Sequence, residues 1–172
     1  MELPDVLELP GARVRALRTD DWVLDHALSR IPDVHRWTYY PAAIEPAEAR
    51  ERVARSLAQR ADGRGARWAV ERAGSAVGTI GIVLRVDGPY VYYALLPEGR
   101  GSGLATAAVR VVSDWVLAHW AADVRAVTMV GNLSSERVLE RVSFRRAGVD
   151  VEPDGVSVTR WVRTHDTQPT VQ

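Results

Sequence analysis

Near residue 100 the hydrophobic pattern of this chain changes from the period of a strand to the period of a helix, and glycines stand where it changes. Residues 90–96 (YVYYALL) have the aromatic and β-branched content of a strand. Beyond residue 103, apolar side chains recur with the spacing of one helix face. They are Leu104, Ala108, Val111, Trp115 and Ala118. The segment between them, PEGRGSG, breaks both patterns, so the sequence predicts a strand that turns through a glycine loop into a helix.

The remaining elements follow from alternation, turn residues and helix-end signals. Further strands are predicted at residues 6–9, 13–17, 67–72, 77–84, 124–130, 144–151 and 156–162. Further helices are predicted at 20–30, capped by Thr19-Asp20-Asp21, at 46–61, ended by Asp62-Gly63, and at 134–142. Residues 31–41, with prolines and aromatics, are predicted to be a loop. Early helices, an antiparallel meander and one β-α-β crossover indicate an α+β fold, with a mixed, mostly antiparallel central sheet flanked by helices.

Composition narrows the classes of function. The length of 172 residues suits one domain, which we expect to span 1–164 and to be followed by a disordered tail at 165–172. The 22 basic residues, all arginine, balance 22 acidic ones, so net charge favours neither nucleic acid nor a membrane surface as a partner. Cysteine is absent and the four histidines are isolated, so we expect no metal site. No apolar run has membrane-spanning length and we expect no signal peptide, which favours a cytoplasmic protein.

The glycine segment predicts a phosphate site. Glycines between a strand and a helix turn free N–H groups outward at the helix N-terminus, where phosphate binds without a cationic side chain. A P-loop needs a lysine, which this chain lacks. A dinucleotide fingerprint needs a small residue where Thr106 stands and an acid ending the next strand, which ends instead in Met129-Val130-Gly131. The plainer alternative is a glycine turn that only permits a sharp bend.

Two segments resemble one family. Residues 100–105 (RGSGLA) resemble the Arg/Gln-x-x-Gly-x-Gly/Ala signature of the GNAT superfamily of N-acetyltransferases. Residues 132–144 (NLSSERVLERVSF) resemble its Asn-x-x-Ser/Ala-x-x-x-x-Glu-Lys-x-Gly-Phe segment, and the chain's single Asn and single Phe fall at its two ends. The resemblance covers residues 8–163 and is strongest to the Rim-type subfamily, which acetylates ribosomal-protein N-termini. It implies the GNAT fold and direct transfer of an acetyl group, in a ternary complex, from acetyl-coenzyme A to the primary amine of a protein N-terminus or a small molecule.

The resemblance also implies site residues. Those implied for coenzyme A are Ala94, Leu95, Leu96, Arg100, Gly101, Ser102, Gly103, Leu104, Ala105, Thr106, Asn132, Ser135 and Arg137. A splayed or bulged strand at 94–96 would lend N–H groups to the thioester carbonyl, and Asn132 would bind the pantetheine arm. Ser135 would be the general acid that stabilises the thiolate, and Arg137 would reach a phosphate. Plainer interpretations stay open: Asn132 as a turn residue, Ser135 as a helix N-cap, a place that Ser134 can also fill, and Arg137 as an exposed helix residue.

Three departures from the family pattern affect the mechanism. Ser143 replaces the usual glycine and is strained if its φ is positive. Leu139 stands where many members carry a tyrosine general acid, which leaves Ser135 as the substitute. The strands at 77–84 and 90–96 contain no acid, so the general base is not assigned. An α-amino group with a pKa of about 8 is already partly neutral at pH 7, so a water chain ending at a tyrosine suffices as its proton acceptor.

Aromatic residues predict the acceptor pocket. The walls expected are Trp37, Tyr39, Tyr40, Tyr90 and Tyr92, with ordinary core packing as the alternative. Such walls favour an apolar or aromatic amine and lack the acidic cluster that a polycation requires.

Two other functions stay open. One is a non-catalytic module that binds acyl-coenzyme A as a sensor or scaffold. The other is a transferase that uses succinyl-coenzyme A, whose carboxylate would pair with Arg85 or Arg36. Dimers are common in the Rim-type subfamily, so the resemblance also leaves open whether this chain forms a homodimer.

Overall fold

The computed structural model describes residues 3–165, in which one sheet of eight strands forms the frame. The strands are β1 (Val6–Leu9), β2 (Ala12–Ala16), β3 (Gly65–Arg72), β4 (Ser75–Arg85), β5 (Gly88–Leu95), β6 (Asp123–Met129), β7 (Arg145–Val151) and β8 (Ser157–Thr164). Their order in the sheet is β1-β2-β3-β4-β5-β6-β8-β7, and every neighbouring pair is antiparallel except β5 and β6. The predicted α+β fold with a mixed, mostly antiparallel sheet is therefore confirmed.

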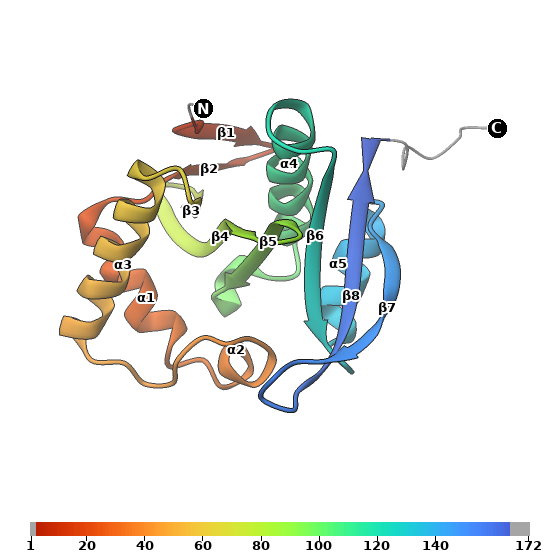
Figure 1. Cartoon of the computed structure of the whole chain (residues 1–172). Helices are drawn as coiled ribbons and strands as arrows, with labels where there is room; N and C mark the ends of the chain where they lie inside the picture. The colour runs from red at the N-terminus through yellow and green to blue at the C-terminus, as the bar shows by residue number, and fades with distance from the viewer. Residues whose placement is uncertain (1–2, 166–172) are drawn as a thin grey trace.

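Helices cover both faces of the sheet. They are α1 (Trp22–Leu28), α2 (Pro32–Trp37), α3 (Pro46–Ala61), α4 (Leu104–His119) and α5 (Leu133–Arg141), with short 3-10 turns at Thr19–Asp21 and Pro97–Gly99. Helices α1 and α3 pack together on one face, against β4 and β3, whereas α4 packs on the other face against β1, β5 and β6 (Figure 1). None of the helices in residues 3–165 is long and apolar enough to cross a membrane.

The larger part of the core lies between the sheet and α4. The predicted α4 stripe is correct at Leu104 and Ala108, and the buried face then continues through Val112 and Val116. Val111 and Trp115 are half buried and pack against this core, whereas Ala118 is exposed, so the prediction was wrong at Ala118. The predicted steps of three and four keep a stripe on one face of a straight helix, whereas the observed steps of four turn the buried stripe around the helix axis by about 40° per step.

Two local predictions are corrected at the N-terminal end. The predicted loop at 31–41 contains α2, because Pro32 takes the first helical position, where its missing N–H costs nothing. The expected N-cap position is correct, because Asp21 is the N-cap residue of α1, but the expected capping role is not, because the Asp21 side chain makes no capping hydrogen bond to that helix. Asp21 instead points inward and accepts two hydrogen bonds from Arg15, each of 2.8 Å.

Other turn predictions hold. Helix α3 ends at Asp62-Gly63, with Gly63 at φ 67°, as predicted. The predicted tail lies outside the described residues apart from His165, whose Nε2 lies 2.6 Å from the Leu117 carbonyl oxygen.

Candidate functional site

Strands β5 and β6 separate towards their C-terminal ends. The β4–β5 register runs without a shift from Gly78 opposite Leu95 to Arg85 opposite Gly88, so β5 carries no bulge on that side. Within residues 3–165, the β5–β6 ladder consists of the single pair Tyr90 and Arg125. The strand is therefore splayed, which is one of the two forms that the family resemblance implied.

The splay leaves a main-chain donor facing the opening. The Leu96 N–H donates to the Val77 carbonyl of β4 at 2.9 Å. Donor directions alternate along a strand, so the N–H of Leu95 faces the β6 side, where β6 has already diverged.

The N-terminus of α4 presents further main-chain donors. Gly103 occupies the N-cap at φ 75°, Gly101 has φ 78°, and no side chain caps the helix. The first intrahelical bond runs from the Ala107 N–H to the Gly103 carbonyl at 3.0 Å. The N–H groups of residues 104–106 thus have no acceptor within the helix and point towards its N-terminal end. A groove of about 470 Å³ lies along this terminus.

Most residues predicted for coenzyme A line this groove. They are Ala94, Leu95, Arg100, Gly101, Gly103, Leu104, Ala105, Thr106, Asn132 and Ser135. Three do not line it. Leu96 is buried with its N–H turned to β4, Ser102 accepts a hydrogen bond from Arg72, and Arg137 is exposed on α5.

Two arginines hold the glycine loop in place. Arg72 on β3 donates to the Ser102 hydroxyl at 2.8 Å and to the Glu98 carbonyl. Arg100 donates to the Leu95 carbonyl at 2.8 and 3.0 Å and forms an ion pair of 2.5 Å with Asp33 of α2. No local sequence pattern marks Arg72, because its contact with Ser102 joins residues 30 positions apart.

Asn132 is the N-cap of α5. Its Oδ1 accepts from the Ser135 N–H at 3.3 Å and from the Ser134 hydroxyl at 3.0 Å. The alternative in which Ser134 or Ser135 caps the helix through its hydroxyl is therefore wrong. Capping by Asn132 leaves the Ser135 hydroxyl free for another partner.

That partner is Tyr93 of β5, which donates to Ser135 Oγ at 3.0 Å. Burial raises the pKa of the Tyr93 phenol to about 12, although the bond with Ser135 acts in the opposite direction. The phenol therefore keeps its proton at neutral pH. Leu139, at the position where the family often has tyrosine, is buried and has no donor, as expected. Tyr93 supplies a phenol at the same serine from the sheet, and sequence reasoning missed it.

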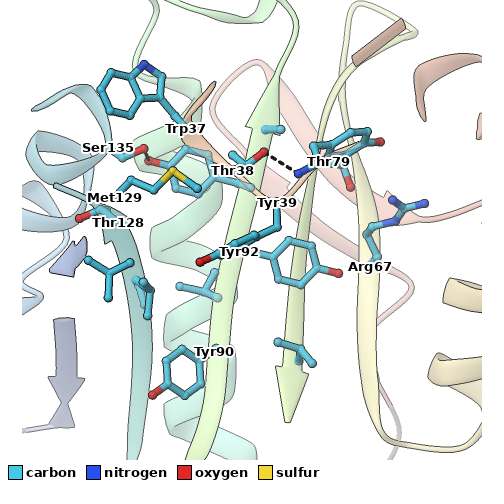
Figure 2. Close-up of a pocket in the computed structure, with 18 of the residues that line it drawn as sticks. Trp37, Thr38, Tyr39, Arg67, Thr79, Tyr90, Tyr92, Thr128, Met129 and Ser135 are labelled. Atoms are coloured by element: carbon cyan, nitrogen blue, oxygen red, sulfur yellow. Dashed lines mark hydrogen bonds between the residues drawn. The ribbon is translucent and has the colours of Figure 1, made fainter. Parts of the chain in front are cut away.

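A second space, of about 450 Å³, opens on the other side of Ser135. All five aromatic residues predicted for the acceptor line it: Trp37, Tyr39, Tyr40, Tyr90 and Tyr92. Figure 2 shows Ser135 and Met129 at one end of this cavity, Arg67 at the other, and Tyr92 between them. The cavity and the groove share Trp37, Thr38, Tyr93, Ala94, Asn132 and Ser135.

The aromatic walls are fixed by specific contacts. Tyr92 lies over Gly81 of β4, where an added Cβ would come within 2.3 Å of its ring. The Tyr40 hydroxyl donates to Asp25 at 2.6 Å, and burial together with that carboxylate raises the pKa of Tyr40. The Tyr90 hydroxyl donates to Asp87 at 2.6 Å, whereas Tyr39 is 60% exposed.

Two further predictions can be placed. Ser143 has φ 64°, so the substitution of the usual glycine does leave a serine in the left-handed region, where it closes the end of α5. Of the two arginines considered for a succinyl carboxylate, Arg85 lines the cavity. Arg36 does not line it and stacks over Trp37, with its guanidinium carbon 4.8 Å from the ring centre.

Comparison with known proteins gives a family and a set of similar folds. Residues 12–145 match the family described as "Acetyltransferase (GNAT) domain". No curated protein sequence matches the chain. RimJ of Mycobacterium smegmatis, solved with CoA-disulfide, is 22% identical, with a TM-score of 0.77 over 96% of this chain and 88% of that one.

Two more solved structures have the same fold at lower identity. The Salmonella typhimurium acetyl transferase that modifies the N-terminal serine of ribosomal protein L7/L12 is 14% identical, with a TM-score of 0.80 over 92% of this chain and 98% of its own. The microcin C7 self-immunity acetyltransferase MccE, solved with acetyl-CoA and AMP, is 12% identical, with a TM-score of 0.82 over 94% and 97% of the two chains. At these identities the likeness is one of fold.

Proposed function

The chain belongs to the GNAT acetyltransferase family, an acyltransferase class, and we propose that it moves an acetyl group from acetyl-coenzyme A to a primary amine by direct transfer in a ternary complex. The observation that carries the proposal is the junction of the groove and the cavity at Ser135 and Tyr93. A donor that enters from one side and an acceptor that enters from the other meet there without a covalent enzyme intermediate.

The groove fits the donor. Uncapped N–H groups at the start of α4 suit a pyrophosphate, and Gly101 and Gly103 have no atom within 4 Å of an added Cβ, so they leave room for a ligand to approach the main chain. Asn132 lines the same groove between the loop and the junction and would contact the pantetheine arm. The Leu95 N–H, which faces the splay, would donate to the thioester carbonyl as negative charge develops on its oxygen.

The Tyr93–Ser135 pair supplies the proton that the leaving sulfur needs. As the new C–N bond forms and the C–S bond breaks, Ser135 donates its proton to sulfur and receives one from the Tyr93 phenol. The amine nitrogen releases one proton to water as the amide forms, the thiol gains one from Ser135, and solvent returns one to Tyr93, so the reaction is balanced. An α-amino group with a pKa of about 8 supplies enough neutral amine at pH 7 for attack. We assign no residue as general base.

Two measurements test the proposal. Calorimetric titration with acetyl-coenzyme A alone is expected to give saturable binding, and Ser135→Ala is expected to keep that affinity while losing most of the turnover of amine substrates. Ser113→Ala is the control, because it deletes a buried hydroxyl on α4 that lines neither the groove nor the cavity. Binding without turnover of any amine would favour the non-catalytic module, faster turnover of succinyl-coenzyme A would change the donor, and absence of binding would refute the proposal.

A further inference from the structure

The end of the acceptor cavity away from Ser135 is built around a buried ion cluster. We call it the Asp25 cluster, and its members are Asp25, Tyr40, Arg52 and Arg67. Asp25 is 1% exposed and accepts from the Tyr40 hydroxyl at 2.6 Å and from Arg67 Nη2 at 2.9 Å. Arg52 Nε lies 3.4 Å from the same carboxylate. One negative charge thus faces two positive charges.

The excess positive charge borders the cavity. Arg52, Arg67 and Tyr40 all line it, whereas Asp25 lies behind them. Arg67 is only 5% exposed, and its buried Nε has no hydrogen-bond partner in the described part of the chain. The Nε of Arg52 is likewise buried without a hydrogen bond there.

The remaining charges on the cavity wall do not cancel this excess. Arg55 and Arg85 add two further positive charges to the lining, and Arg55 lies 3.7 Å from the exposed Glu51 outside it. Glu152 is the acid among the lining residues, and it is already paired with Arg160 at 3.2 Å. The cavity is therefore an arginine-rich space with aromatic walls.

A buried guanidinium with an unsatisfied N–H is costly unless a ligand or water completes its hydrogen bonds. Burial lowers the pKa of Arg67, but Asp25 more than offsets this and leaves it raised, so the side chain stays charged. A carboxylate matches a guanidinium with two parallel hydrogen bonds, which is the strongest neutralisation available to it.

We propose that the acceptor amine carries a carboxylate several bonds from its nitrogen, and that Arg67, assisted by Arg52, binds that carboxylate. The inference rests on the proposed function and specifies its substrate: a peptide N-terminus followed closely by an acidic side chain. It modifies the expectation of a purely apolar or aromatic acceptor, since the aromatic walls remain but one end of the cavity is cationic.

The spacing of the two ends sets the length of the acceptor. Arg67, Gly81 and Tyr92 lie in one row across β3, β4 and β5, and Ala94 at the junction lies two residues further along β5. Two strand spacings and two residues separate the Cα atoms of Arg67 and Ala94 by about 12 Å. The α-carboxylate of a free amino acid lies too close to its own nitrogen to reach both ends. A side-chain carboxylate on the second residue of a peptide has the required reach.

The first test uses the unaltered protein and two tripeptide amides that differ only in glutamate or glutamine at the second position. We expect kcat/KM to be about 10- to 100-fold higher for the glutamate peptide, as a charge-assisted hydrogen bond predicts. Equal rates for the two peptides would overturn this inference and leave the proposed function intact. Acetylation of neither peptide, nor of any other amine, would refute the proposed function and this inference with it.

The second test uses Arg67→Gln, which is expected to reduce the ratio of the two peptides to about one while the Kd for acetyl-coenzyme A stays unchanged. Arg64→Gln is the matched control, since Arg64 is exposed, outside the cavity and paired with Asp62. If Arg67→Gln does not fold because Asp25 loses its partner, the double variant Asp25→Asn with Arg67→Gln removes both charges together. A preference for glutamate that survives in the folded variant, or an effect of Arg67 on succinyl-coenzyme A instead of on the peptide, would overturn the assignment.

Discussion

The hydroxyl of Tyr93 is the feature of the junction that a single conservative change removes. Tyr93→Phe keeps the ring and deletes one hydrogen bond, the 3.0 Å contact with Ser135. Loss of one neutral hydrogen bond costs about 1 kcal/mol of stability, so the variant is expected to stay folded. Ser135 keeps its own proton, but it loses the phenol that would supply a new proton after the first is donated to sulfur. We therefore expect kcat to fall by about 100-fold, the lower part of the range for general acid catalysis.

Kinetics of a double-variant cycle give the sharpest readout. If Tyr93 acts through Ser135, the double variant Tyr93→Phe with Ser135→Ala should be no slower than Ser135→Ala alone, because the rate losses caused by two residues of one proton relay do not add. Ser113→Ala is the control: it deletes a buried hydroxyl on α4 that lines neither the groove nor the cavity. The Kd for acetyl-coenzyme A should be the same in all variants.

The pH profile tests whether the Tyr93 phenol stays protonated over the pH range in which the amine substrate titrates. Because burial raises the pKa of Tyr93 to about 12, the phenol stays protonated throughout the range in which the amine titrates. We expect kcat/KM to rise to a plateau as the amine is deprotonated, near pH 8, and to stay there up to about pH 10. Independent, additive effects of Tyr93→Phe and Ser135→Ala, or wild-type kcat in Tyr93→Phe, would refute the relay.

Two further predictions concern the glycine loop and the N-terminal ion pairs. Gly103→Ala is expected to weaken acetyl-coenzyme A binding about tenfold, since φ 75° costs an alanine about 1–2 kcal/mol. Gly74→Ala is the control, because Gly74 has φ 80° but lies in the distant β3–β4 turn, and this variant should bind normally. Equal affinity of the two variants in a calorimetric titration would contradict the assignment of the glycine loop as the phosphate site. Burial raises the pKa of Asp21 but Arg15 more than offsets it, and Arg15 also lowers the pKa of Glu71. In the unfolded chain the pKa is about 3.9 for Asp and about 4.3 for Glu. Because both pKa values are lower in the folded protein, the two ionised carboxylates stabilise the fold above these pH values, and the stabilisation is lost as the pH falls below them. The urea concentration at the unfolding midpoint should therefore drop as the pH falls from about 5 to about 3 in the wild type, and less steeply in Arg15→Met. Parallel drops in the two proteins would refute this role of Arg15.

The elements that sequence reasoning placed correctly are those whose signals are local. The change of period at residues 97–103 lies within one stretch of chain, and so does the Asp62-Gly63 stop. Helix α2 was missed because two prolines and three aromatics are typical of a loop, and only packing determines that Pro32 starts a helix.

The residues that were missed at the site act through contacts between distant parts of the chain. Arg67 meets Asp25 across 42 positions and Tyr93 meets Ser135 across the same separation, and neither pairing leaves a local pattern. Tyr93 also sits among other aromatics on a strand with both faces covered, where alternation does not distinguish a core ring from a site ring. The family motif led to Ser135, and only the register of β5 against the rest of the sheet reveals its partner.

The splay of β5 has a consequence for how such a fold diversifies. The groups that it exposes, together with those at the start of α4, are peptide N–H groups, which every residue except proline provides. Exchange of the side chains around them leaves these donors in place as long as the backbone keeps its course. The acceptor cavity is lined mainly by side chains, so substitution there changes the partner molecule directly. Mutational drift in this fold can therefore alter substrate choice one residue at a time without dismantling the donor groove.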